Sequence, residues 1–236
     1  MDKQFNFQEL HAIVAALRGE NGCPWDKAQT HESLKGNTVE EAYEVNQAVS
    51  DLTATGDSSH LQEELGDLLL QVLLHSQIAE EYGEFTLEDV IDGIARKMIH
   101  RHPHVFGGVS YDSIEEQKKD WERLKGQEDG HQYSSPAQEL KEVPLAFPAL
   151  IRGQKVMKKA MKHDLVSSAD ADIMKEMLQS MVDLQVCTSH PEDSDTFSEK
   201  LGQTLLAILK LAARYKVDAE MALTGEIERF IKECQD

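Results

Sequence analysis

The segment Leu61-Gln-Glu-Glu-Leu-Gly-Asp-Leu-Leu-Leu-Gln-Val-Leu-Leu-His-Ser-Gln-Ile78 decides the fold of this chain. At about 100° per residue, its apolar side chains form an arc broad enough for a buried helix. Glu64 and Asp67 are spaced i, i+3, so both lie on one side of that helix, hemmed in by apolar residues. The segment predicts a long helix with two carboxylates at the edge of its buried face.

A second acid pair with the same spacing stands upstream in Glu41-Ala-Tyr-Glu44. The polar stretch 53–59 is rich in turn formers, so we expect an antiparallel helical hairpin that aims four carboxylates at one point. Converging carboxylates repel one another unless a cation neutralises them, and hard oxygen ligands suit Mg2+, which suits phosphate chemistry. The alternative is a hairpin with incidental acids at a core boundary, because 43 of the 236 residues are acidic.

Nearly every other periodic segment also predicts a helix, so the expected fold class is all-α. Thr38 is the expected N-cap of the first hairpin helix, with Glu41 as its capping-box partner, which is a competing role for that acid. Segment 21–26 is expected to be a loop because it contains Asn-Gly and proline, and segment 126–136 is a polar, glycine-containing linker. The remaining predicted helices span 7–17, 59–81, 86–100, 113–125, 149–161, 170–186, 196–216 and 218–233.

Composition limits the classes of partner. The formal net charge of −19 disfavours binding to nucleic acid or to an anionic membrane, because both require a positive surface. The three cysteines lie far apart and form no CxxC motif, which favours a reducing compartment. The chain shows no signal-peptide core and no apolar run of membrane-spanning length. These features predict a cytoplasmic protein.

The second half of the chain repeats the helix pattern of the first. Leu65-Gly-Asp-Leu-Leu69 matches Leu201-Gly-Gln-Thr-Leu205, a register that places Lys200 opposite Glu64 and Gln203 opposite Asp67. Upstream, Glu176-Met-Leu-Gln179 best matches the first acid pair. One carboxylate of four survives, and a lysine at a ligand position opposes metal binding. We interpret the second copy as a scaffold that lost its site.

These motifs resemble the MazG family of nucleoside triphosphate pyrophosphohydrolases. The resemblance rests on Asn21-Gly-Cys-Pro-Trp-Asp26, Thr38-Val-Glu-Glu-Ala-Tyr-Glu44, Glu63-Glu-Leu-Gly-Asp67, Arg101-His-Pro-His-Val-Phe106 and Trp121-Glu-Arg-Leu-Lys125. It implies helical bundles from two tandem copies: an intact N-terminal domain at 1–127, a linker at 128–146 and a degenerate copy at 147–236. In two-domain members the C-terminal copy is usually the catalytic one, so this chain reverses the arrangement.

The resemblance also implies the site and the reaction. Its motif assigns Glu41, Glu44, Glu64 and Asp67 as ligands of Mg2+, with Mn2+ as a second candidate ion. Its triphosphate-binding residues map to Lys97, Arg101, Trp121 and Lys125, and the catalytic set is the four acids with Lys97 and Arg101. The implied enzyme cleaves NTP or dNTP to a monophosphate and diphosphate, a reaction of nucleotide-pool housekeeping. The alternative is a catalytically weak or silent dimerisation or regulatory protein of the same fold.

Other roles for these residues stay open. Lys97 and Arg101 also suit a solvated helix end, where cations complement the helix dipole, and Trp121 also suits a packing role. A di-iron bundle needs Glu-x-x-His on its helices, and the chain offers this spacing only in the linker, at Glu128-Asp-Gly-His131.

The apolar circumference of segment 59–81 predicts an oligomer. An isolated hairpin would leave Leu70, Leu74 and Ile78 in water, so we expect a homodimer or higher homo-oligomer. Coverage by the C-terminal copy within one chain is the alternative.

Overall fold

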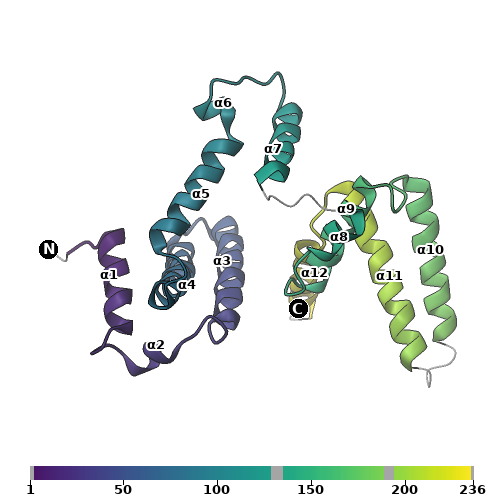
Figure 1. The fold of residues 1–236 in the computed structure, drawn as a ribbon. Coiled ribbons are helices and arrows are strands. Elements are labelled where there is room, and N and C mark those ends of the chain that lie inside the picture. The colour runs from purple at the N-terminus through teal and green to yellow at the C-terminus, as the bar shows by residue number, and fades with distance from the viewer. Residues whose placement is uncertain (1–2, 129–134, 189–193, 235–236) are drawn as a thin grey trace. The chain divides into compact units, whose positions relative to one another are not determined.

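The computed structural model describes residues 3–128, 135–188 and 194–234, and in these ranges the chain forms helices and no strand (Figure 1). The all-α prediction is confirmed. The chain divides into two compact units, 1–130 and 131–236. Most of the predicted linker 126–136 lies outside the described residues. The first unit holds α1 Phe7–Arg18, α2 Pro24–Ala28, α3 Lys35–Thr55, α4 Ser59–Tyr82, α5 Leu87–Arg101, α6 Pro103–Phe106 and α7 Ile114–Glu128.

Helices α3 and α4 form the predicted hairpin and lie side by side in Figure 1. Both end at a glycine in the left-handed region, Gly56 with φ of 77° and Gly83 with φ of 69°, a conformation that glycine adopts without a Cβ penalty. The connection between them is shorter than predicted, because α3 continues to Thr55. This close turn holds the two acid-bearing helices in a fixed register.

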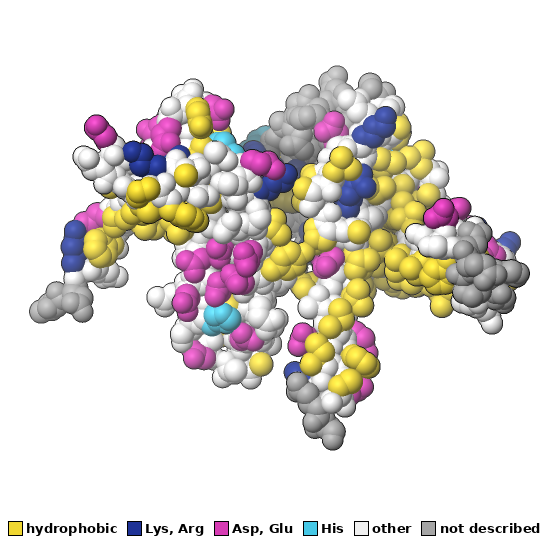
Figure 2. Space-filling view, turned by 90° about the horizontal axis from the view of Figure 1, so that it is seen from below, with side chains coloured by type: hydrophobic (Ala, Val, Ile, Leu, Met, Phe, Trp, Pro, Cys, Tyr) yellow, Lys and Arg dark blue, Asp and Glu magenta, His cyan; other side chains and the backbone are white. Residues whose placement is uncertain are grey.

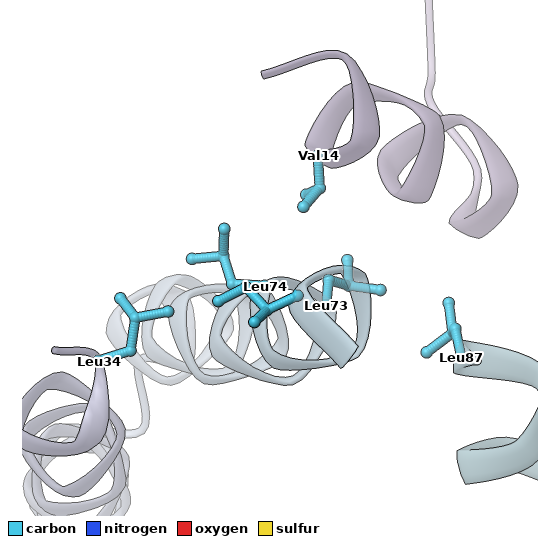
Figure 3. Close-up of a cluster of buried hydrophobic side chains, with 6 residues drawn as sticks. Val14, Leu34, Leu73, Leu74 and Leu87 are labelled. Carbon is cyan, nitrogen blue, oxygen red and sulfur yellow. The ribbon is translucent and has the colours of Figure 1, made fainter. Parts of the chain in front are cut away.

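The core of the first unit centres on α4. Its members come from α1, the residue before α3, α4 and the start of α5: Val14, Leu34, Leu73, Leu74, Ile78 and Leu87. Figure 3 shows Val14, Leu34 and Leu87 on the elements around α4, which carries Leu73 and Leu74. Leu74 and Ile78 are therefore covered within the unit, and the expectation that they would lie in water without a partner chain is wrong. Burial of each such side chain contributes about 1.5–3 kcal/mol.

The ends of α5 follow their sequence signals. Thr86 and Asp89 form a capping box at its start, and Pro103 stands two residues after its last residue, Arg101. At the start of α7 the backbone N–H of Glu116 donates to Ser113 Oγ at 3.1 Å. Helix α5 packs on α4 near its start and on α7 further along, so it extends from the hairpin towards α7.

Two local predictions are wrong. Helix α3 begins at Lys35 rather than at Thr38, whose Oγ1 instead donates to Leu34 O inside the helix at 3.1 Å. Glu41 therefore has no capping role. Segment 21–26, expected to be a loop, contains the start of α2, which begins at Pro24 because proline is favourable in the first turn of a helix.

The second unit holds α8 Pro136–Lys141, α9 Ala149–Lys162, α10 Asp170–Cys187, α11 Ser194–Tyr215 and α12 Ala219–Glu233. Helices α10 and α11 form a second hairpin, and α9 packs against α11 and α12. Ile173 is almost fully buried, at 1% exposed. Among the described helices of both units, none combines the length and the apolarity that crossing a bilayer requires.

Candidate functional site

Three predicted metal ligands meet between α3 and α4. Glu41, Glu64 and Asp67 each offer a carboxylate oxygen, and these oxygens all lie within 4.8 Å of one another. We call these three residues the carboxylate cluster. The hairpin register explains the convergence, because the mid-part of α3 faces the first half of α4. Glu44, the fourth predicted ligand, lies one turn along α3 on the exposed surface and close enough to perturb Glu41.

The electrostatics of the cluster favour a bound cation. The pKa of Glu41 is raised, first by burial and then by the negative charges of Asp67 and Glu44. Within the described residues, this is the one group of three or more acidic, histidine or cysteine side chains close enough to share a metal ion. The donor set is made of hard oxygens and carries excess negative charge, so the residues present fit a hard divalent cation.

A histidine bridges the cluster to the hairpin turn. His60 Nδ1 lies 3.0 Å from Asp51 Oδ2, and His60 Nε2 lies 3.0 Å from Glu64 Oε1. The pKa of His60 is raised, chiefly by its hydrogen bond to Asp51 and in smaller part by Glu64. The Glu64 side chain is only 12% exposed, so His60 is one of the few groups that can position it.

An amide supports the other side of the cluster. Gln71, one turn beyond Asp67 on α4, is 5% exposed, and its Nε2 donates to Glu41 Oε1 at 3.3 Å. This hydrogen bond opposes the rise in the Glu41 pKa. Gln71 Oε1 is buried without a hydrogen-bond partner. A buried orphan acceptor costs about 1–3 kcal/mol, so Gln71 is retained at a cost in stability beside the proposed ligands.

The predicted triphosphate-binding residues lie on another helix pair, α5 and α7. Arg101 and Lys125 both stand over the Trp121 ring, at 5.5 and 5.2 Å from its centroid. Trp121 thus packs against two cations, and its predicted role in triphosphate binding stays a prediction. Lys97, one turn before Arg101, lines a hollow of about 370 Å³ with His100 and Gln127. Arg101, Trp121 and Lys125 thus lie together, and Lys97 lies one turn before Arg101 on α5; we call these four residues the basic group.

The second hairpin carries a different charge pattern at the matching positions. Lys200 Nζ donates to Gln203 Oε1 at 3.1 Å, which pairs the two residues that replace Glu64 and Asp67. Glu176, in the register of Glu41, forms an ion pair with Lys210 from α11. The Lys210 side chain is 7% exposed. The Lys210 ammonium group thus neutralises Glu176.

Sequence reasoning missed His60 and Gln71. The contacts of His60 with Asp51 and of Gln71 with Glu41 depend on the hairpin register, whereas the contact of His60 with Glu64 follows from their i, i+4 spacing on α4. The available signal was indirect, because Gln71 stands four residues after Asp67 and so lies on the same face of α4.

A known protein family matches the part of the chain that carries these motifs. The family model described as the MazG nucleotide pyrophosphohydrolase domain matches residues 29–106. This range begins just before α3 and ends with α6, so it contains the carboxylate cluster, Lys97 and Arg101.

Similar proteins extend over nearly the whole chain. The chain is 37% identical over 229 residues to the nucleoside triphosphate pyrophosphohydrolase/pyrophosphatase MazG of Thermotoga maritima, covering 96% of this chain and 83% of that protein. It is 35% identical over 233 residues to the nucleoside triphosphate pyrophosphohydrolase of Escherichia coli K12, covering 94% of this chain and 82% of that protein. It is also 39% identical over 224 residues to the uncharacterized protein YabN of Bacillus subtilis, covering 95% of this chain but only 44% of that protein.

Proposed function

Because the chain belongs to the MazG family, and is therefore a hydrolase, we propose that it splits nucleoside triphosphates into a nucleoside monophosphate and diphosphate. The observation that carries the proposal is the convergence of Glu41, Glu64 and Asp67 within 4.8 Å on two helices. Such a cluster suits the neutralisation of phosphate charge through a metal ion rather than covalent catalysis. The proposed role is the clearance of NTPs or dNTPs from the nucleotide pool.

Mg2+ is the ion we assign to the cluster, with Mn2+ as a substitute. Glu41, Glu64 and Asp67 would hold it, together with Glu44 from the exposed edge of α3. When bound, such an ion offsets phosphate charge and acidifies a coordinated water. Gln71 fixes the orientation of Glu41, and His60 fixes that of Glu64. One acid of the cluster accepts the proton of the attacking water.

The basic group on α5 and α7 would bind the remainder of the triphosphate. Lys97, Arg101 and Lys125 supply positive charge for the leaving diphosphate, and Trp121 keeps two of these cations in place. In this proposal one substrate molecule contacts both the carboxylate cluster on α3 and α4 and the basic group on α5 and α7.

The proposed activity resides in the first unit. We also propose that the chain consists of an intact domain at 1–127, a linker at 128–146 and a degenerate copy at 147–236. The assignment of activity to the first unit is supported by the ion pair between Glu176 and Lys210, which engages the one acid retained at a ligand position in the second hairpin. We also propose a cytoplasmic location, which agrees with the three free cysteines, Cys23, Cys187 and Cys234.

We still propose a homodimer or higher homo-oligomer, but the interface would involve other residues than Leu74 and Ile78. Apolar side chains form broad areas of the surface in Figure 2. On α3 and α5, Val39, Tyr43, Ile91 and Ile94 are each 44–52% exposed. A second copy is the proposed cover for these faces. Light scattering at micromolar concentration should give at least twice the chain mass of 26.5 kDa; a monomer that still hydrolyses NTP would contradict the assembly.

The test of the reaction is hydrolysis of a panel of NTPs and dNTPs with Mg2+ in 18O-labelled water. Attack at the α phosphorus should place the label in the nucleoside monophosphate. Label in diphosphate, or nucleoside diphosphate and phosphate as products, would contradict the assigned bond. No turnover of any nucleotide would instead support a silent helical protein of this fold.

A further inference from the structure

Helix α9 is strongly basic in a strongly acidic chain. Its fourteen residues contain Arg152, Lys155, Lys158, Lys159 and Lys162 and no Asp or Glu, whereas the whole chain has a net charge of −19. Such a concentration of like charge is unfavourable unless partners or ligands neutralise it.

Two of these cations, Lys159 and Lys162, neutralise a buried carboxylate. Glu139 on α8 is 6% exposed, and it accepts from Lys159 Nζ at 2.8 Å and from Lys162 Nζ at 3.3 Å. His163 Nε2 also contacts this carboxylate. The structure therefore uses Lys159 and Lys162 to neutralise a buried acid.

Lys155 and Lys158 line a different place, a hollow of about 350 Å³ between α9, the end of α11 and the start of α12. Lys216 lines it from the α11–α12 connection, and Ile151 and Ala213 supply apolar walls. We call this hollow the lysine pocket. Its volume lies within the range of small-ligand sites, about 300–1,000 Å³.

The rim of the pocket is held in place by hydrogen bonds. Gln154 Nε2 donates to Val217 O, and Gln154 Oε1 accepts from the backbone N–H of Ala219 at 3.1 Å. Asp218, the acid at the rim, accepts from the backbone N–H of Met221 at 3.0 Å and so caps α12. The lining contains three lysines and one acid, so its net charge is positive.

Lys216, in the lining of the pocket, has an unusual backbone conformation. Its φ of 57° lies in the left-handed region, which favours glycine. The same connection closes the end of α11, because Val217 N donates to Ala212 O at 3.0 Å. A lysine at a position where glycine fits better points to a use for its ammonium group.

We propose that the lysine pocket binds a small di- or triphosphate anion without a divalent cation. Lysines from α9 and from the α11–α12 connection line the same hollow, and Lys155 Nζ also lies 5.5 Å from the centroid of the Phe147 ring. Phosphate oxygens accept hydrogen bonds from lysine with few demands on geometry. The second unit has lost the acids for metal-assisted binding, so direct contact with lysine is the chemistry that remains to it. The site is distinct from the carboxylate cluster and does not depend on the proposed hydrolysis.

The test is calorimetric titration of the full chain with inorganic diphosphate and, separately, triphosphate, in EDTA at low salt. EDTA keeps the carboxylate cluster without a cation, so the cluster repels these anions. The wild-type chain should bind one of them, with affinity that falls as salt rises. Absence of binding at millimolar anion would overturn the proposal.

Lys216→Gly is the decisive variant because glycine suits the left-handed conformation. It should lower anion affinity at least tenfold and raise the midpoint of thermal unfolding. Lys155→Met should lower affinity as much, whereas Lys175→Met, an exposed lysine on α10, should leave it within twofold. Equal losses in Lys175→Met, or loss in Lys97→Met with retention in Lys216→Gly, would overturn the assignment.

Discussion

Replacement of Gln71 by leucine should separate metal binding from folding stability. The Gln71 side chain is 5% exposed, with Nε2 bonded to Glu41 Oε1 at 3.3 Å and Oε1 left without a partner. Leucine has a similar volume, so the variant should keep the packing of α3 on α4 while it removes both polar groups.

The two effects have opposite signs. A hydrogen bond to a charged group contributes about 1.5–3 kcal/mol, and the lower end applies at 3.3 Å. Its loss frees Glu41 to reorient, which should weaken divalent-ion binding about tenfold, the lower end of the 10–100-fold range for residues that orient metal ligands. Removal of the orphan oxygen offsets a cost of about 1–3 kcal/mol. The free energy of unfolding in EDTA should therefore stay constant or rise.

The assay is Mn2+ binding to the nucleotide-free protein, followed by the electron paramagnetic resonance signal of free Mn2+, with urea unfolding in EDTA. Gln77→Leu is the matched control, because Gln77 lies on the same helix and its amide reaches Glu81 at 3.5 Å. Unchanged Mn2+ affinity in Gln71→Leu would refute the positioning role. A loss of more than about 3 kcal/mol of stability would show that its oxygen is satisfied.

Three further predictions address the acids and the core. Burial alone would raise the pKa of Glu139, but hydrogen bonds from neighbouring lysine and histidine side chains lower it to about 2. The ionised Glu139 therefore stabilises the folded state by about 3 kcal/mol at most. This contribution is complete above pH 4.5, the ordinary pKa of the group. Urea unfolding should show this contribution disappear as pH falls from there towards 2, and Glu139→Gln should remove that dependence. Glu64→Gln should lower turnover at least about 100-fold with unchanged circular dichroism, whereas Glu176→Gln should change turnover less than twofold; equal losses would place activity in both hairpins. Leu73→Ala, at a side chain 0% exposed, should destabilise by about 2–5 kcal/mol, and Leu65→Ala, 50% exposed, by less than about 1 kcal/mol in the same unfolding assay.

Helix ends with a local chemical cause could be predicted from the sequence. The capping box of Thr86 and Asp89, the Ser113 cap and the left-handed Gly83 each depend on a few neighbouring residues. The start of α3 could not be predicted in this way. Leu34 is buried in the core and holds the first turn, so the helix begins before the stronger local signal at Thr38.

Helical spacing was enough to predict the acids of the carboxylate cluster. The residues that surround these acids could not be predicted without knowledge of the hairpin register. The i, i+3 spacing of Glu64 and Asp67 places both on one face, and the paired motif on α3 supplies Glu41. The contact of Gln71 with Glu41 depends on which turns of the antiparallel helices face each other. The cover over Leu74 and Ile78 likewise depends on α1 and α5, which pack on α4 from distant parts of the chain.

Under the proposed assignment of Mg2+ to the carboxylate cluster, the Lys210–Glu176 pair would give the two hairpins different dependence on free Mg2+. An ion bound only by the folded state stabilises it by RT ln(1 + [L]/Kd), about 2.7 kcal/mol at one hundred times Kd. The first hairpin would gain this energy from solution and lose it under chelation. In the second hairpin the cation beside Glu176 is the ammonium group of Lys210, which is part of the chain and which no chelator removes. Under this proposal the folding of the second hairpin would not depend on the supply of divalent ions.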